Sequence, residues 1–202
     1  MKRQIYKSPR FWEQETTPVW LPVSVAAVKK AARMDSTDTL MDDSIGLNIE
    51  IVTSRVEAYC GIILRDTKFT AYYDDFPVVI NIQKAPFVSL NGIAYVIDDV
   101  ATALDLTTIQ QQVKKHEVNI FPTKSSNFPS TDENVDSVSV DINFGYIEDE
   151  GIPKAIQGAI MTSVVAMLFG SDEDCSSSKD VLCGTSKSML KPFKNSFGWM
   201  AH

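Results

Sequence analysis

The segment from Gly151 to Asp174 reads GIPKAIQGAIMTSVVAMLFGSDED and contains a long uncharged run between acidic flanks. Such a run can cross a membrane, build a core, or meet copies of the same chain. Residues 155–171 are at the short limit for a bilayer crossing and include Gln, Gly, Thr and Ser. The apolar side chains recur at helical spacing, which predicts a mostly buried helix from about Pro153 to Gly170. Its expected buried stripe is Ile156, Ile160, Val164 and Met167.

The composition is that of a globular protein with an acidic balance. The chain has 202 residues, 44% of them hydrophobic, and a formal net charge of -7. This suits one domain, or one domain with extended arms. It disfavours nucleic-acid binding through phosphates, which needs clustered Lys and Arg. The three cysteines form no CxxC pair, which argues against a disulfide scaffold or a zinc site and favours a reducing cytoplasm: Cys60, Cys175 and Cys183.

Two further helices are expected before the central part of the chain. Ser24 is placed to cap a short helix that begins at Val25. A long helix is expected from about Thr39 to Cys60, and Gly61 is placed to end it. We expect this long helix to pack against the helix after Pro153. The residues expected in the core or in subunit packing are Ile45, Ile49, Val52, Val56, Ile156, Ile160 and Val164.

Between these helices the apolar period changes to two, which predicts strands. The expected strands lie within residues 64–77, 78–82, 87–98, 116–122 and 138–144. Asn91-Gly92 is the strongest signal for a hairpin turn. The predicted class is α+β. It is a mainly helical core, with two long helices and short N- and C-terminal helices, carrying a small antiparallel β-sheet or hairpin insertion.

The sequence contains no motif that predicts catalysis. It has no GxxxxGK[ST] loop, no GxSxG and no HExxH. His116 begins an expected strand, where a surface or packing role is favoured over that of a catalytic base. The acidic pairs are interpreted as turn formers and helix caps, since adjacent strand residues point to opposite faces: Asp42/Asp43, Asp74/Asp75 and Asp98/Asp99. We therefore expect no catalytic residue, no cofactor and no metal.

The chain carries a series of short motifs in a fixed order: Leu21–Ser24, Glu57–Gly61, Phe76-Pro77, Pro86–Leu90, Phe144–Tyr146, Ile152–Ile156 and Met189–Phe193. Together they resemble the head-tail connector (adaptor) proteins of long-tailed bacteriophages. The resemblance covers residues 20–195 and rests on the order of the motifs, since each alone is weak. This chain departs from the family in its N-terminal arm, in Lys194 where an Arg is usual, and in its aromatic tail.

The resemblance implies a structural virion protein without enzymatic activity. Family members form a closed, roughly twelve-fold ring under the portal, joining capsid to tail and extending the DNA channel. The implied partners are further copies of the chain, the portal protein, a head-tail stopper or tail protein, and viral dsDNA that passes through without sequence-specific binding. No membrane is implied. The implied location is the virion neck, after synthesis in the host cytoplasm.

The implied domain organisation has three parts. Residues 1–20 are an extended N-terminal arm, residues 21–184 the connector domain, and residues 185–202 a short helix and tail. Two alternatives stay open for the function. One is another neck or tail component, such as a stopper or tail terminator. The other is a small soluble enzyme that uses an acidic pair or Cys175 and Cys183.

The C-terminal segment is the expected portal contact. Large aromatic side chains on a tail are costly in water unless they are buried against something. The resemblance implies that this segment attaches to the portal, and the alternative is that it folds back on its own subunit. The residues expected to bind the portal are Met189, Leu190, Phe193, Phe197 and Trp199.

Overall fold

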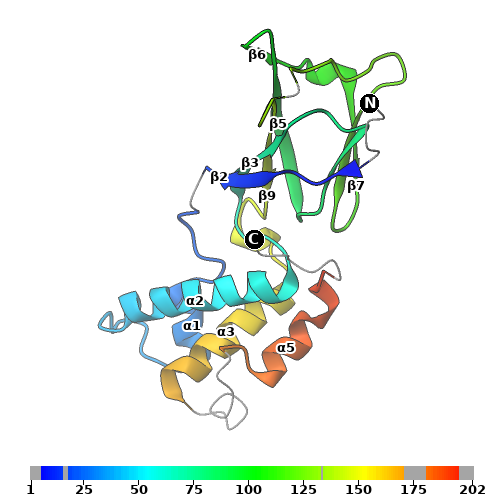
Figure 1. Cartoon of the computed structure of the whole chain (residues 1–202). Helices are drawn as coiled ribbons and strands as arrows, with labels where there is room; N and C mark the ends of the chain where they lie inside the picture. Colours follow the sequence, from blue (N-terminus) through cyan, green and yellow to red (C-terminus); the bar gives the residue numbers. More distant parts are fainter. Residues whose placement is uncertain (1–5, 16–17, 133, 171–180, 196–202) are drawn as a thin grey trace. The chain divides into compact units, whose positions relative to one another are not determined.

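The computed structural model describes residues 6–15, 18–132, 134–170 and 181–195. The chain forms two compact units (Figure 1). The sheet unit comprises Met1–Pro18 and Asp66–Gly145, and the helical unit comprises Val19–Arg65 and Tyr146–His202. The expected N-terminal arm, residues 1–20, is therefore shared between the two units.

The helical unit is built around α3 (Lys154–Phe169), the helix expected from the uncharged run. Among the described residues, three helices contact α3: α1 (Val25–Ala31), α2 (Asp42–Cys60) and α5 (Gly184–Leu190), the last of which continues into η3 (Lys191–Phe193). A further short turn, η2 (Asp149–Gly151), precedes α3. Because neighbours cover several of its sides, α3 can be apolar nearly all round without crossing a membrane.

Local signals set the ends of these helices. The Ser24 side chain accepts a hydrogen bond from the Ala27 N–H at 3.2 Å, as expected of an N-cap. Gly61 and Gly170 follow α2 and α3 with φ of 65° and 58°, a conformation that costs glycine little. The second helix begins at Asp42 rather than near Thr39.

The sheet unit contains a five-stranded and a four-stranded sheet. The five-stranded sheet has the order β2 (Phe11–Gln14), β3 (Thr67–Tyr73), β9 (Val138–Phe144), β5 (Phe87–Ile97) and β6 (Val100–Ala103). The four-stranded sheet has the order β1 (Tyr6–Lys7), β4 (Val79–Ile82), β8 (Val118–Pro122) and β7 (Ile109–Val113). A short turn, η1 (Leu106–Thr108), precedes β7. Neighbouring strands are antiparallel, except β1 with β4.

The prediction of a mainly helical core with a small sheet insertion is wrong. The sheets form a unit with a core of its own, in which β9 alternates buried and half-buried residues along its whole length. Aromatic rings fill this core, and Phe76 stacks on Phe128 with 4.6 Å between ring centroids. Strand β7 is not predicted from the sequence, because its residues IQQQV do not alternate between apolar and polar. Four of its five side chains are exposed, and its pairing with β8 defines it.

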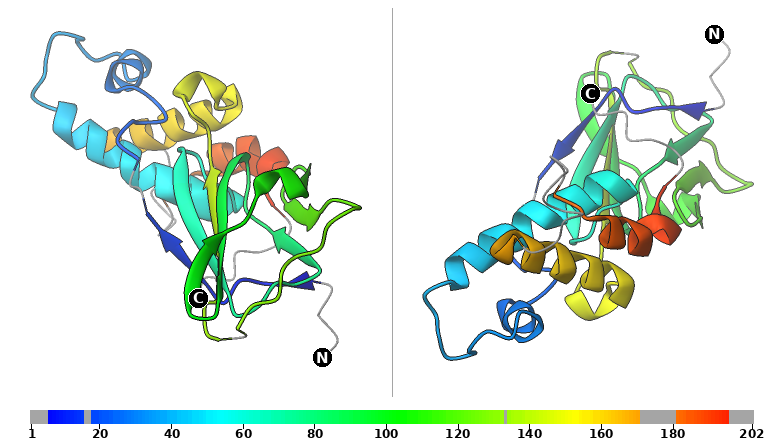
Figure 2. Two further views of the ribbon diagram at one scale, coloured as in Figure 1. Left: turned by 90° about the horizontal axis from the view of Figure 1, so that it is seen from above. Right: turned by 90° about the horizontal axis from the view of Figure 1, so that it is seen from below.

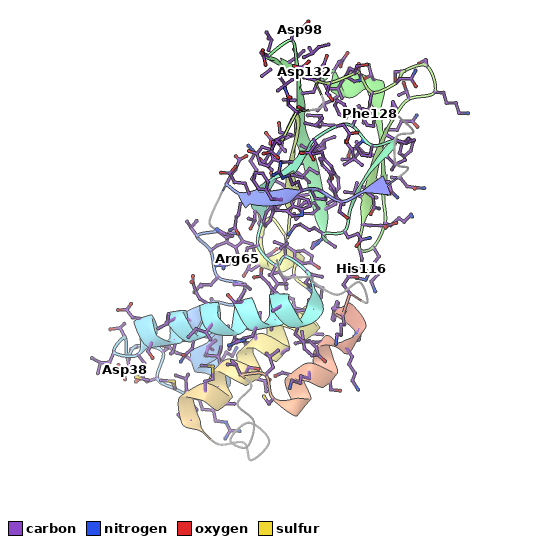
Figure 3. The ribbon with its side chains drawn as sticks, in the orientation of Figure 1. Asp38, Arg65, Asp98, His116, Phe128 and Asp132 are labelled. Atoms are coloured by element: carbon purple, nitrogen blue, oxygen red, sulfur yellow. The ribbon has the colours of Figure 1, made fainter. Side chains whose placement is uncertain are left out.

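The prediction of a hairpin turn at Asn91-Gly92 is also wrong. Both residues lie inside β5, at a shift in its register with β9, and Gly92 does not take a positive φ. The turn between β5 and β6 is instead made by Asp98 and Asp99, whose φ values are 51° and 59°. Their N–H groups donate to the Asp132 carboxylate at 3.1 and 3.0 Å, which holds this left-handed pair in place (Figure 3).

Candidate functional site

The described residues contain neither a metal-binding cluster nor a membrane-spanning helix. Across them, no three His, Cys, Asp or Glu side chains lie close enough to hold a metal ion. No helix in the described part of the chain is both long and apolar enough to span a bilayer. The acidic pairs lie at separate turns and helix ends. Asp42 pairs with Lys29, Asp74 accepts from the Asp136 N–H at 3.2 Å, and Asp98 belongs to the β5–β6 turn.

The histidine and cysteines considered from sequence also lie apart. His116 is in the turn between β7 and β8, where burial and neighbouring Lys115 lower its pKa. Burial raises the pKa of the Cys60 thiol to about 11, which makes it a poor nucleophile. Cys183 is buried, with its sulfur 3.4 Å from the Ser186 hydroxyl. Cys175 is outside the described residues.

All seven residues expected in the core or in subunit packing lie inside the helical unit. Each is completely buried, so these side chains pack within one subunit and are not available to a neighbour. Met167, expected on the same stripe, is 39% exposed. The buried set is Ile45, Ile49, Val52, Val56, Ile156, Ile160 and Val164.

The end of α2 is a junction for two other parts of the chain. The Glu57 carboxylate accepts a hydrogen bond from the Leu64 N–H at 2.8 Å, and the Glu57 carbonyl accepts from the Gly61 N–H at 2.8 Å. Burial raises the pKa of Glu57. The Cys60 carbonyl accepts from the Asn195 N–H at 2.7 Å. The motif Glu57–Gly61 therefore anchors both the segment that leaves α2 and the last described residue.

The C-terminal segment is tied to the helical unit as far as Asn195. Leu190 is completely buried, and Phe193 packs against the core. The Lys194 ammonium lies 4.9 Å from the centre of the Tyr59 ring, within the range of a cation–π interaction. Met189 is 36% exposed. The other two residues expected to bind the portal, Phe197 and Trp199, are outside the described residues.

A buried pair of serines that sequence reasoning missed attaches α5 to α3. The Ser163 hydroxyl donates to Ser186 at 2.8 Å, and the Ser186 hydroxyl donates to the Ala159 carbonyl at 3.1 Å. Both side chains are completely buried. No local pattern marks them, because the pair is 23 residues apart.

A second missed feature is an apolar surface on α2. Leu47 and Ile51 are 62% and 37% exposed. They lie four residues apart on α2, off the stripe that faces the core. Their spacing is visible in the sequence and could have identified them. Beside them runs an open groove, lined by Val19, Leu21, Val25, Asp42, Asp43, Gly46, Leu47 and Glu50.

Comparison with known proteins gives a fold and no family. No protein-family model matches the chain, and no curated protein matches it. A chain in a structure described as the neck of an empty gene transfer agent (GTA) particle, computed with C6 symmetry, superimposes with a TM-score of 0.71 at 10% identity. That match covers 92% of this chain and 95% of the other.

Two further solved structures share the fold. A chain in the virion of the native GTA particle matches with a TM-score of 0.70 and 11% identity, over 91% of this chain and 95% of that one. A chain in the neck of the native particle, computed with C12 symmetry, matches with a TM-score of 0.57 and 11% identity, over 92% and 95%. The matches span almost the whole chain, so they include both the helical and the sheet units.

Proposed function

We propose that this protein is a structural component of the neck of a phage-like particle. The observation that carries the proposal is the whole-chain fold match, at a TM-score of 0.71, to a chain from the neck of a GTA particle. The motif resemblance to head-tail connector proteins supports the same assignment independently. It rests on short sequence motifs, whereas the match to the GTA chain rests on the fold and has only 10% sequence identity. In this role the protein is not an enzyme.

Within the neck we propose the role of adaptor: a closed ring beneath the portal that extends the channel for viral dsDNA. The neck structures that contain a chain with the same fold were computed with C6 and C12 symmetry, which supports a ring of roughly twelve copies. The net charge of -7 is compatible with a channel wall that does not hold phosphates. The partners on either side of the ring are the portal protein and a stopper or tail protein.

Portal attachment is assigned to the C-terminal tail. Leu190 and Phe193 are held by the helical unit, so they position the tail rather than leave the core to bind the portal. The contacts are then made by the residues after Asn195, with Phe197 and Trp199 as aromatic anchors.

A truncation placed after Asn195 tests this attachment. It keeps the hydrogen bond from Asn195 to Cys60 and every residue of the helical unit that is buried in the described part of the chain. We expect the truncated protein to keep its thermal midpoint and its circular dichroism spectrum and to lose co-sedimentation with portal-bearing capsids. The double variant Phe197→Ala/Trp199→Ala should behave in the same way, while removal of Ala201 and His202 alone serves as the control.

The outcomes of these experiments distinguish the adaptor role of the protein from the role of its tail in portal attachment. Negative-stain images of the full-length protein with its portal should show a ring on the portal, and a protein that never joins the portal would overturn the adaptor role. If the truncated protein joins portal-bearing capsids normally, the role of the tail is wrong and the adaptor role stands. If the truncation lowers the thermal midpoint, the tail folds back on its own subunit.

A further inference from the structure

The helical unit has an apolar surface that its own core does not use. Leu47, on α2, is 62% exposed, and Val19, at the start of the unit, is 97% exposed. Both line the open groove beside α2. Grouped apolar side chains at a surface are typical of a contact with another protein.

The shape of this groove admits side chains from outside. Gly46, on α2, is one of its lining residues, and a Cβ atom placed there would meet nothing within 4 Å. Val19, Leu21 and Val25 line the groove together with residues from the first half of α2. The groove therefore has apolar lining residues, and the absence of a side chain at position 46 leaves room for one from a partner.

The rim of the groove is acidic. Asp42 and Asp43 lie in the first turn of α2, and Glu50 lies two turns later. Asp42 is paired with the buried Lys29, and Glu50 lies 3.6 Å from Arg65. Asp43 is exposed. A partner that fits this rim carries positive charge beside apolar groups.

The same chain carries such a surface at α5 and η3. Residues 181–195 contain Lys187, Lys191 and Lys194 and no acidic residue. Lys191 and Lys194 are exposed, and Met189 beside them is 36% exposed. This surface has the positive charge and the exposed apolar group that fit the acidic rim and apolar lining of the groove.

The two surfaces lie toward opposite ends of α2, a helix of 19 residues and therefore about 28 Å long. The groove involves the first half of α2, whereas Lys194 and Asn195 contact Tyr59 and Cys60 in its last turn. Both views in Figure 2 show α1 at one end of α2 and α5 toward the other. Complementary surfaces at opposite ends produce head-to-tail contacts, which form a ring when the rotation between neighbours closes.

We propose that the groove beside α2 receives the basic α5–η3 surface of a neighbouring copy of this chain. This inference rests on the proposed ring and names the contact that closes it. Met189 or Lys191 of one copy lies over Gly46 and Leu47 of the next, and Asp43 faces the lysines. The contact leaves the tail after Asn195 for the portal.

Charge reversal on each side of the contact tests the proposal. Asp43→Lys should raise the protein concentration needed for ring assembly about tenfold, and Lys191→Glu should do the same. Neither residue is buried, so both variants should keep the thermal midpoint of the native protein. Matched controls are Glu148→Lys and Lys124→Glu, which reverse exposed charges that belong to neither surface and should assemble normally.

Mixing the two single variants gives the deciding result. In a head-to-tail ring that alternates the variants, every groove again meets an end of opposite charge. The equimolar mixture should therefore assemble at the native concentration, as measured by native mass spectrometry and negative stain, with equal numbers of each variant in the ring. Rescue by mixing supports the head-to-tail contact over a general effect of charge.

Three results would overturn the inference. Normal ring assembly by both single variants would exclude this contact, and so would failure of the mixture to assemble when both variants are folded. If a reversed charge lowers the thermal midpoint, Leu47→Ser provides a second test, because that exposed side chain should be needed for assembly and not for folding. A native protein that forms no ring, even with its portal, would instead overturn the proposed function and this inference with it.

Discussion

At the residue scale, Lys84 contacts aromatic side chains of the two neighbouring strands β2 and β3 in the sheet unit. Its ammonium lies 4.9 Å from the centre of the Trp12 ring and 4.6 Å from that of Phe69. Trp12 is on β2 and Phe69 is on β3. Burial lowers the pKa of Lys84 to about 8, since a charge loses its water there. The residue therefore combines a favourable cation–π contact with an unfavourable desolvation.

Lys84→Met separates these two effects. Between pH 8 and the ordinary pKa of 10.5, the unfolded chain binds more protons at this position than the folded chain, so native stability should rise with pH. Below pH 8 the burial cost is present in full. Met keeps the apolar contact without the charge, so we expect the variant to be more stable at pH 7, by on the order of 1 kcal/mol after the cation–π loss.

The measurement is urea unfolding of both proteins at pH 7 and pH 10. The stability difference between variant and native should be smaller at pH 10 than at pH 7. Lys124→Met, an exposed lysine of the same unit, should show no such change. A Lys84 variant that is less stable than the native protein at both pH values would show that the ring contacts outweigh the desolvation.

At the element scale, α5 depends on a buried hydroxyl pair as well as on apolar packing. It is a helix of seven residues, too short to be stable alone. Leu190 places its side chain in the core, and Ser186 connects α5 to both Ser163 and the Ala159 carbonyl of α3. This attachment fixes the position from which η3 and the tail begin.

Ser186→Ala should therefore loosen α5. The substitution leaves the buried Ser163 hydroxyl without this acceptor, which we expect to lower the free energy of unfolding by about 1–3 kcal/mol. Hydrogen exchange should show faster exchange in α5 than elsewhere in the helical unit. Ser188→Ala, on the exposed side of the same helix, is the matched control and should change little. Equal behaviour of the two variants would show that the hydroxyl pair is not needed.

At the scale of the whole molecule, each unit has its own hydrophobic core. Ile156, Ile160 and Val164 are buried in the helical unit, whereas Val140 and Phe144 are buried in the sheet unit. The chain passes from one unit to the other after residues 18, 65 and 145. A destabilising substitution in one core should therefore first destabilise the helices or strands of that unit.

Ile160→Asp places an unpaired charge in the core of the helical unit. We expect the free energy of unfolding to fall by several kcal/mol, on the order of 3–5. Hydrogen exchange should lose protection in α2 and α3 before it does so in β3 and β9. Met167→Asp introduces the same charge on the same helix at a position 39% exposed, and should cost much less. An unchanged thermal midpoint for Ile160→Asp would contradict the burial of this side chain.

Much of the chain's local structure was available from its sequence. The ends of α3 follow from Pro153 and Gly170, the end of α2 follows from Gly61, and the alternation from Val138 to Phe144 predicts β9. These signals depend on φ, ψ and side-chain period within a few residues, so the sequence carries them directly.

The tertiary structure decided what depends on distant residues. Strand β7 exists because β8 pairs with it, Asn91-Gly92 lies in a strand because β5 continues along β9, and Ser163 meets Ser186 across 23 residues. The largely apolar helix α3 is explained by the described helices that pack around it, and the sequence of α3 does not identify these neighbours. Local rules leave such pairings open because their free energy comes from long-range burial and hydrogen bonds, which form only in the complete fold.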